Sequence, residues 1–281
     1  MCIFSLIQDL YNNLNCQKQV VGKSFLGKPI YCFTIKKSEY PVLIFTYSIH
    51  AREYITSYLA IEQIKSFYKK GKMGTVHFIP MVNPDGVEIA LTKNPLYKAN
   101  ARGVDLNVNF DANWGTGKQN VFVKGEQNYV GTHPFSEPES LALRDFTLKI
   151  NPDMTVSYHS KGEEIYWEFF QDKKRLKRDC VFAKVISDCT GYPMVRIKDS
   201  AGGYKDWCVQ KLKIPAVTIE VGSDLLSHPL DQRHLPEILA KNQRVVFALT
   251  EKFNELLYEK SACASKNSLK KGRSANRRDN S

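Results

Sequence analysis

The sequence lacks several features that would assign the protein to a membrane-bound or disulfide-rich class. It contains no run of about 20 apolar residues, so we expect no transmembrane helix and no membrane partner. It shows no internal repeat. Its 7 cysteines are scattered and include no Cys-x-x-Cys pair, so we interpret them as reduced thiols, several of them in the core. These absences favour a cytoplasmic protein.

The N-terminal segment also lacks the pattern of a secretion signal. Met1–Leu10 has no basic residue before its apolar stretch and contains Asp9. We therefore expect an amphipathic helix there. A hydrophobic fraction of 43% in 281 residues suffices for the core of a globular protein with one or two domains.

Acidic residues are few relative to basic ones, which gives a net charge of +11. Part of the excess lies in residues 260–281, a segment with few apolar residues that we expect to be a disordered tail. Its charges are Lys260, Lys266, Lys270, Lys271, Arg273, Arg277 and Arg278 against Asp279. No aromatic residues interleave them for base stacking, so a solvated tail is favoured over contact with nucleic acid.

Apolar runs alternate with helical patterns along the chain, which predicts an α/β fold with a mainly parallel or mixed sheet and helices on both faces. Strands are expected at 41–49, 75–82, 154–158 and 216–219, a hairpin at 18–36, and helices at 3–14, 54–70, 174–190 and 235–259. Another helix is expected to start with Ser136 as its N-cap. By composition, 83–86 predicts a turn and 92–135 a loop.

The first of these strands leads into a candidate metal site. The apolar run 42–47 precedes Ser48–Tyr54, which holds His50 and Glu53 just before a helical pattern. This spacing lets an imidazole nitrogen and a carboxylate oxygen bind one zinc ion. Arg52 lies between them and places a cation beside the same point. The alternative is an ordinary strand–helix junction with a solvated arginine and glutamate.

Two further candidates follow other apolar strands. His159 comes after 154–158, and Glu220 comes after 216–219. Open α/β sheets place their sites at the carboxyl edge of the strands, so these side chains are expected to meet His50 and Glu53 there. His159 can complete a His-Glu-His zinc set that leaves a fourth position for water. Glu220 can act as the general base toward that water and the leaving amine.

The other histidines are weaker candidates for metal binding, and Asp105 is a candidate supporting residue. The histidines without a matching carboxylate are His77, inside a strand, and His133, His228 and His234, in loops or beside prolines. Asp105 is the candidate for holding the second ring nitrogen of His50, because zinc-bound histidines usually donate to a carboxylate or carbonyl. The alternative for Asp105 is an Asx-turn.

The chain resembles the zinc carboxypeptidase family from about residue 20 to about residue 255. The resemblance rests on seven blocks in the family's order: His50-Ala51-Arg52-Glu53, Asn83-Pro84-Asp85-Gly86, Gly103-Val104-Asp105-Leu106-Asn107 with Asn109-Phe110, Ser136-Glu137-Pro138-Glu139, His159-Ser160, Gly202-Gly203 with Asp206-Trp207, and Thr218-Ile219-Glu220. It implies one catalytic domain over residues 1–259, with an eight-stranded mixed sheet and helices on both faces.

The resemblance also implies the chemistry of the site. One zinc ion would be held by His50, Glu53 and His159, Glu220 would be the base, and Arg52 would polarise the scissile carbonyl and stabilise the oxyanion. The activity implied is that of a zinc-dependent metallocarboxypeptidase acting on a small peptide.

The chain departs from the family's pattern at positions that are expected to bind the substrate. Where the family has an Asn-Arg pair that grips the substrate's terminal carboxylate, this chain has Asn107 followed by Val108. Where the family has a mobile tyrosine, it has Lys198, and the specificity-pocket position is Lys205. We expect Lys205, Lys198, Arg102 and Lys98 to replace the missing arginine between them, with Arg102 and Lys98 competing for the second cationic role. Solvent exposure is the alternative for Lys198 and Lys205.

A lysine-lined pocket favours a substrate with an acidic side chain or an extra carboxylate. Family members with such departures cleave cell-wall peptides next to diaminopimelate, so a short acidic or murein-derived peptide is the expected substrate. Two alternatives stay open. One is a zinc-dependent deacylase of N-acyl amino acids on the same fold, and the other is a non-catalytic binding protein that uses its basic tail.

Overall fold

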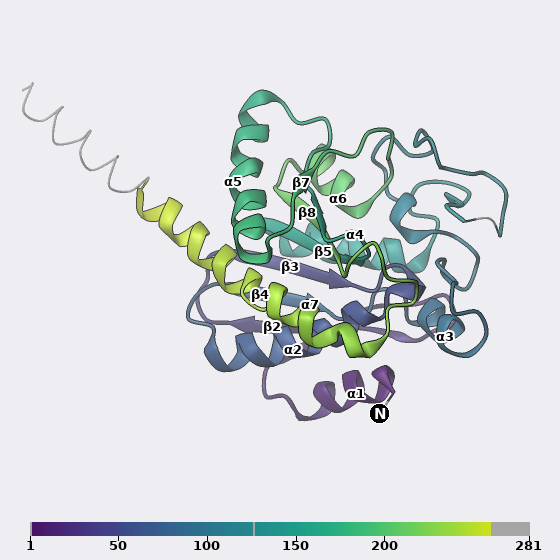
Figure 1. The fold of residues 1–281 in the computed structure, drawn as a ribbon, viewed down its shortest axis with the longest axis horizontal. Helices are drawn as coiled ribbons and strands as arrows, with labels where there is room; N and C mark the ends of the chain where they lie inside the picture. Colours follow the sequence, from purple (N-terminus) through teal and green to yellow (C-terminus); the bar gives the residue numbers. More distant parts are fainter. Residues whose placement is uncertain (1, 126, 260–281) are drawn as a thin grey trace, which may run out of the picture.

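The computed structural model describes residues 2–125 and 127–259, which build an eight-stranded mixed sheet with helices on both faces (Figure 1). The strands are β1 (Gln17–Lys23), β2 (Pro29–Lys36), β3 (Val42–Tyr47), β4 (Thr75–Ile79), β5 (Met154–Ser160), β6 (Glu164–Tyr166), β7 (Met194–Val195) and β8 (Ala216–Val221). Their order is β1-β2-β4-β3-β5-β8-β6-β7. The fold class expected from the sequence is confirmed.

The centre of the sheet is parallel, and this decides where the candidate residues lie. β3 pairs in parallel with β4 and with β5, and β5 pairs in parallel with β8, so these four strands end at one edge. In the register, Tyr47 is opposite Tyr158 and His159 is opposite Glu220. β1 and β2 are antiparallel additions on one side, and β6 runs antiparallel to β8 on the other.

The helices are α1 (Ile3–Asn13), α2 (Ile55–Lys70), α3 (Pro84–Thr92), α4 (Pro138–Ile150), α5 (Lys173–Thr190), α6 (Tyr204–Trp207) and α7 (Leu235–Asn242), followed by a helix over 245–259. Short helical turns are η1 (Ala51–Glu53), η2 (Leu106–Val108), η3 (Cys208–Leu212) and η4 (Gln232–His234).

Two buried clusters hold these layers together, one on each face of the sheet. Alternate residues of β3 serve both faces: Phe45 and Tyr47 lie in the cluster formed with α1, α2, α5 and α7, whereas Ile44 lies in the cluster formed with α4 and α6. On the first face Tyr47 stacks on Tyr158 with ring centroids 5.1 Å apart. The rigid sheet therefore fixes the strand ends from both sides.

The stretch 83–86 is a helix start and not the free turn that its composition predicts. Asn83 is the N-cap of α3, and its side chain accepts a hydrogen bond from the Gly86 backbone N–H at 3.0 Å. Pro84 occupies the first turn, where its missing N–H costs no hydrogen bond. Asparagine and proline favour helix starts as well as turns, which is why composition alone misassigned them.

Two other helix boundaries differ from the prediction. α4 begins at Pro138 with Glu137 as its N-cap, and the Ser136 hydroxyl donates to the Glu137 carboxylate at 2.8 Å instead of capping the helix. The closing helix expected over 235–259 is two helices, because α7 ends at Asn242 and the next begins at residue 245. The short strands β6 and β7 and the four-residue helix α6 were not predicted from the sequence.

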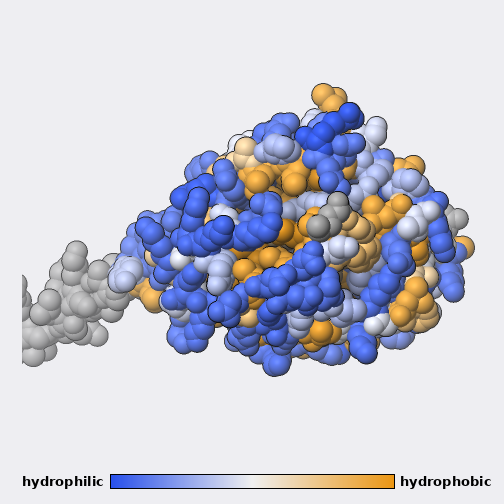
Figure 2. Space-filling view, turned by 90° about the horizontal axis from the view of Figure 1, so that it is seen from below, coloured by the Kyte–Doolittle hydropathy of each residue, from blue (hydrophilic) through white to orange (hydrophobic). Residues whose placement is uncertain are grey.

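The surface and the cysteines agree with a globular chain. Figure 2 shows apolar side chains in patches among hydrophilic ones on the face seen from below. No helix in the described part of the chain is long and apolar enough to cross a membrane. The six described cysteines are free, and two of them, Cys32 and Cys208, are buried. Cys263 and the basic segment 260–281 lie outside the described residues.

Candidate active site

The candidate site begins at a sharp turn after β3. Ser48 adopts a positive φ of 49°, and its backbone N–H donates to the Thr56 hydroxyl at 2.9 Å. Its own hydroxyl lies 2.7 Å from the Ser57 hydroxyl. These buried contacts anchor the turn to the start of α2, so that His50 and Glu53 lie over the ends of the parallel strands.

Three side chains converge on one point there. His50 Nδ1 lies 2.8 Å from Glu53 Oε1, and His159 Nδ1 lies 3.1 Å from Glu53 Oε2. The two Nδ1 atoms are 3.2 Å apart. All three side chains are buried, and their ligand atoms lie within 4.8 Å of one another. The sequence prediction that these residues meet is confirmed as geometry.

The donor set fits a zinc ion. Two imidazole nitrogens and a carboxylate oxygen facing one another can hold a metal cation between them, and two histidines with one glutamate are a common catalytic zinc set. Burial opposes protonation of His50, yet the Glu53 and Asp105 carboxylates outweigh it and raise the pKa of His50 to about 9. Burial likewise opposes ionisation of Glu53, but the two histidines lower its pKa. The site therefore attracts positive charge.

Asp105 holds His50 from behind. His50 Nε2 donates to Asp105 Oδ1 at 3.1 Å, which turns Nδ1 toward Glu53 and His159, where the neutral ring can bind a metal. The same carboxylate accepts the Asn107 backbone N–H at 2.9 Å, so the Asx-turn interpretation is also correct. Its other oxygen lies 2.7 Å from Lys98 Nζ. These contacts fix the orientation of the His50 ring.

Glu220 faces this cluster from β8. Its Cα pairs with that of His159, and its half-buried side chain lines a cavity of about 640 Å³ that His50 and Asp105 also line. No side chain or backbone group of the described residues donates a hydrogen bond to its carboxylate. Burial and the nearby Glu53 carboxylate raise the pKa of Glu220 well above its ordinary value. A carboxylate in this position is free to accept a proton.

Arg52 lies on η1 between two of the clustered residues. Its Nε is buried and has no hydrogen-bond partner among the described residues. No described carboxylate lies within ion-pair distance of its guanidinium group. Its charge is therefore not neutralised by a salt bridge.

The residues expected to bind substrate separate into two groups. Asn107, Val108, Lys198 and Lys205 all line the cavity, as does Lys98. Arg102 does not line it: its Nε lies 3.6 Å from the Glu137 carboxylate and its guanidinium group covers the Phe25 ring. The expectation that Arg102 faces the substrate is thus not supported by its placement.

The two lysines that replace family residues differ in burial. Lys198 is exposed, as the alternative interpretation had it, and lines the cavity mouth. Lys205 is buried, so solvent exposure is wrong for this residue. Its ammonium group donates to Asp206 Oδ1 at 2.5 Å and to the Glu168 carbonyl at 3.0 Å, and it covers the Phe169 ring.

Sequence reasoning missed several residues of the cavity wall. Tyr166 on β6, Lys118, Asn120 and Asn128 line it without having been singled out. β6 is only three residues long, so its alternation of Glu164, Ile165 and Tyr166 was too short to stand out. The polar–apolar–polar pattern soon after His159 is the signal that could have found it.

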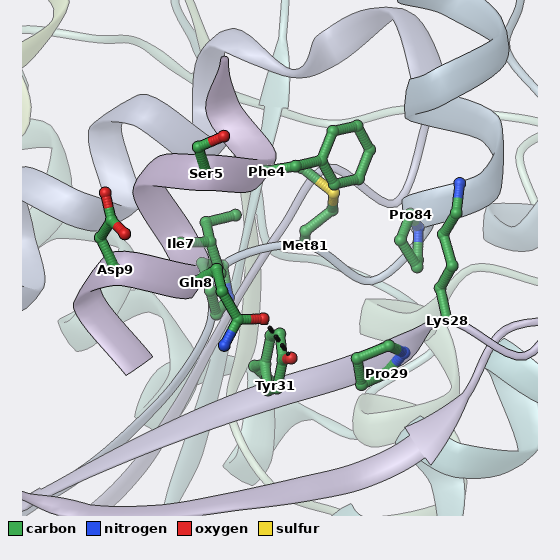
Figure 3. Close-up of a pocket in the computed structure, with 11 residues that line it drawn as sticks. Phe4, Ser5, Ile7, Gln8, Asp9, Lys28, Pro29, Tyr31, Met81 and Pro84 are labelled. Carbon is green, nitrogen blue, oxygen red and sulfur yellow. Dashed lines mark hydrogen bonds between the residues drawn. The ribbon is translucent and has the colours of Figure 1, made fainter. Parts of the chain in front are cut away.

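A second cavity lacks the chemistry of the first. It has a volume of about 450 Å³ and lies between α1, β2 and the segment after β4. Apolar side chains such as Phe4, Ile7 and Met81 form most of its wall, and the Tyr31 hydroxyl donates to Gln8 across it at 2.7 Å (Figure 3). Its lining residues include no histidine, so it offers no site comparable to the buried cluster.

Comparison with known proteins gives one family and several relatives. Residues 5–238 match the family model described as "Zinc carboxypeptidase". The chain is 29% identical over 252 residues to gamma-D-glutamyl-L-diamino acid endopeptidase 1 of Lysinibacillus sphaericus, covering 75% of this chain and 62% of that protein. It is 32% identical over 149 residues to murein peptide amidase A of Escherichia coli strain K12, covering 49% of this chain and 57% of the amidase. The chain thus spans less than two thirds of each of these relatives.

Solved structures share the fold. Bovine thrombin-activatable fibrinolysis inhibitor, in its complex with tick carboxypeptidase inhibitor, superimposes with a TM-score of 0.78 at 21% identity, covering 90% of this chain and 94% of that one. Murein-tripeptide amidase of Escherichia coli O157 gives a TM-score of 0.57 at 24% identity, covering 84% of this chain and 91% of that one. At these identities the likeness concerns the fold alone.

Proposed function

The chain belongs to the zinc carboxypeptidase family, a family of hydrolytic zinc metallopeptidases, and we propose that it hydrolyses an amide bond in a short acidic or murein-derived peptide. The observation that carries this proposal is the meeting of His50, Glu53 and His159 within 4.8 Å of one another, with Glu220 on the wall of the adjoining cavity. His50, Glu53 and His159 would hold one zinc ion. Zinc bound there would supply a Lewis acid that polarises a carbonyl and lowers the pKa of water.

The protein's own groups then perform the proton transfers. Glu220 accepts a proton from the attacking water and gives it to the leaving amine nitrogen. Its carboxylate suits this role because no described residue donates to it and because burial raises its pKa. Arg52 supplies a cation toward the oxygen that gains negative charge. A fixed charge of this kind is among the larger contributions to catalysis.

Substrate recognition is assigned to the cavity wall. Asn107, Lys98, Lys198 and Lys205 line it, and we assign the second cationic role to Lys98 in preference to Arg102, which is turned toward Glu137. Val108 cannot pair with a terminal carboxylate. The names of the endopeptidase and the amidase point to cell-wall peptides, so a peptide containing a diamino acid such as diaminopimelate is the proposed substrate.

A second candidate function shares the site. Val108 lines the cavity at the position where the family's carboxylate-binding arginine stands, which favours a substrate without a terminal carboxylate at that point. A deacylase of N-acyl amino acids is the alternative with a non-peptide substrate, although that substrate keeps a carboxylate beside the leaving nitrogen.

Hydrolysis assays separate the two candidates. The purified chain, loaded with zinc, is incubated with muropeptides, acidic dipeptides and N-acyl amino acids, with and without a chelator. We expect chelator-sensitive cleavage of the muropeptides. Glu220→Gln should reduce the rate by about a hundredfold to ten-thousandfold while zinc content stays at the wild-type level. Cleavage confined to N-acyl amino acids would favour the deacylase, and an active Glu220→Gln variant would refute the base assignment.

A further inference from the structure

The wall of the cavity opposite the lysines is built by two antiparallel strands. In the register of β6 and β8, Glu164 is opposite Glu220 and Tyr166 is opposite Thr218. Side chains of directly paired residues emerge on the same face of a sheet, so these four form one patch. Tyr166, Thr218 and Glu220 line the 640 Å³ cavity. Glu164 therefore lies beside the catalytic wall although it has no role in the mechanism above.

The hydrogen bonding within this patch leaves Glu164 and Tyr166 with acceptor oxygens. The Tyr166 hydroxyl donates its single proton to Glu164 Oε2. Burial and this bond raise the pKa of Tyr166, so the hydroxyl stays protonated. Toward the cavity the Tyr166 oxygen can only accept, whereas the Thr218 hydroxyl can donate as well as accept. No described residue donates to the other oxygen of Glu164 or to Glu220.

The rest of the cavity holds its lysines, together with Asp105, Asp199 and Asp206. Lys98, Lys118 and Lys198 line it from the loops, whereas no lysine or arginine forms an ion pair with Glu164 among the described residues. Gly162 keeps the space around the two acids open. A Cβ atom there would lie 3.7 Å from Glu220 Cβ and 3.9 Å from Glu164 Cδ, so any larger side chain would fill this space.

We propose that Glu164, held by Tyr166, binds an ammonium group of the substrate's diamino acid residue, while the lysines across the cavity take its carboxylate. An ammonium group has three N–H donors and no acceptor, which matches the acceptor oxygens that Glu164 and Tyr166 present. A diamino acid residue carries an ammonium group and a carboxylate group at the end of its side chain. It can therefore contact Glu164 and the lysines at the same time. This inference rests on the proposed function and adds the residue that selects a diamino acid over its deamino analogue.

The test compares two peptides that differ in one amino group. The full chain, loaded with zinc, is assayed on γ-D-glutamyl-diaminopimelate and on γ-D-glutamyl-2-aminopimelate, which keeps the carboxylate and loses the ammonium group. Glu164→Gln should lower kcat/KM for the first peptide by about ten- to a hundredfold and change the second by less than about threefold. The matched control is Glu163→Gln, because Glu163 pairs with Lys241 at 2.6 Å and lies outside the paired residues of β6 and β8.

Tyr166→Phe provides a second variant. It keeps the ring and removes the hydroxyl that orients Glu164, so we expect a smaller loss that is again confined to the diaminopimelate peptide. An equal loss on both peptides in Glu164→Gln would overturn the inference, because it would show that Glu164 acts on the chemical step. No loss on either peptide would overturn it as well.

Binding of the free amino acids separates this inference from the proposed function. Calorimetry on the zinc-loaded protein should show tighter binding of diaminopimelate than of 2-aminopimelate, and Glu164→Gln should abolish the difference. Glu164-dependent binding without cleavage of any peptide would contradict the proposed function and support the inference. Cleavage of both peptides at equal rates, with equal binding of both amino acids, would support the proposed function and refute the inference.

Discussion

Asp105 acts on the site through the hydrogen bond that it accepts from His50. Its carboxylate accepts from His50 Nε2 at 3.1 Å and lies 2.7 Å from Lys98 Nζ. Both contacts keep the imidazole turned so that Nδ1 faces Glu53. The role is that of a positioning residue, because Asp105 acts through His50.

Asp105→Asn should weaken zinc binding or activity by about ten- to a hundredfold, because the amide keeps the shape of the side chain but not its charge. Zinc affinity measured by competition with a chromophoric chelator checks this. The matched control is Asp111→Asn, whose carboxylate pairs with Lys211 at half-exposed positions. Unchanged zinc affinity and turnover in Asp105→Asn would show that the orientation of His50 does not depend on this bond.

At the scale of elements, β4 carries a buried histidine that should make stability depend on pH. Burial lowers the pKa of His77 from its ordinary 6.5 to about 4, and its Nδ1 lies 2.8 Å from the Thr34 hydroxyl on β2. Between these two pKa values the unfolded chain binds a proton that the folded chain does not. Stability contributed by neutral His77 is therefore fully present above pH 6.5 and is lost as the pH falls toward 4.

His77→Gln should remove this part of the pH dependence, which is worth about 3 kcal/mol between the two pKa values. Urea unfolding of the wild type and the variant at several pH values between 4 and 7 measures this effect. The variant should show a smaller slope of the free energy of unfolding against pH. The control is His133→Gln, at an exposed position. The same slope in wild type and His77→Gln would contradict the assignment of a neutral buried imidazole.

The N-cap of α3 links a helix to the site. Asn83 accepts from the Gly86 N–H, and its Nδ2 donates to the carbonyls of Ile49 and Ala99 at 3.2 and 3.0 Å. Ile49 precedes His50, so this side chain also supports the turn that carries the metal cluster. Asn83 thus joins three separate segments through one buried amide.

Asn83→Ala should lower the free energy of unfolding by about 2 kcal/mol or more, because it removes the cap and leaves buried carbonyls unpaired. Denaturant unfolding of the variant and of the exposed control Asn94→Ala measures the difference. An Asn83→Ala protein as stable as the control would mean that the cap and its two carbonyl contacts contribute nothing.

At the scale of the whole molecule, the parts that sequence could predict are those set by strand direction. His50, Glu53, His159 and Glu220 each follow or end an apolar run, and parallel strands bring such residues to one edge. The class of fold and the meeting of the metal cluster follow from that rule. The placement of His50 and Glu53 also depends on the turn after β3, where Ser48 adopts a positive φ of 49°.

The features that sequence did not predict depend on loops and on short elements. Arg102 and Lys98 are near neighbours in the chain, but the course of the loop turns the first toward Glu137 and the second into the cavity. Tyr166 and Glu164 lie on a strand of three residues, too short for its periodicity to be recognised. Specificity is therefore harder to predict than the metal site.

Zinc should also stabilise the whole fold, because the cluster joins η1 and its N-cap His50 to β5, which is distant in the chain. A ligand that binds only the folded state at about 1,000 times its Kd adds about 4 kcal/mol. Thermal unfolding of the wild type with zinc and with a chelator should show a higher Tm with zinc. The same Tm under both conditions would indicate that no folded-state zinc site exists.

The most direct test of the central claim is the zinc stoichiometry of three purified proteins by metal analysis after dialysis. The wild type and Glu220→Gln should each retain one zinc ion per chain, and Glu53→Gln should lose it, because only Glu53 belongs to the set formed with His50 and His159. Zinc retained by Glu53→Gln at the level of the wild type, or absent from the wild type, would contradict the account.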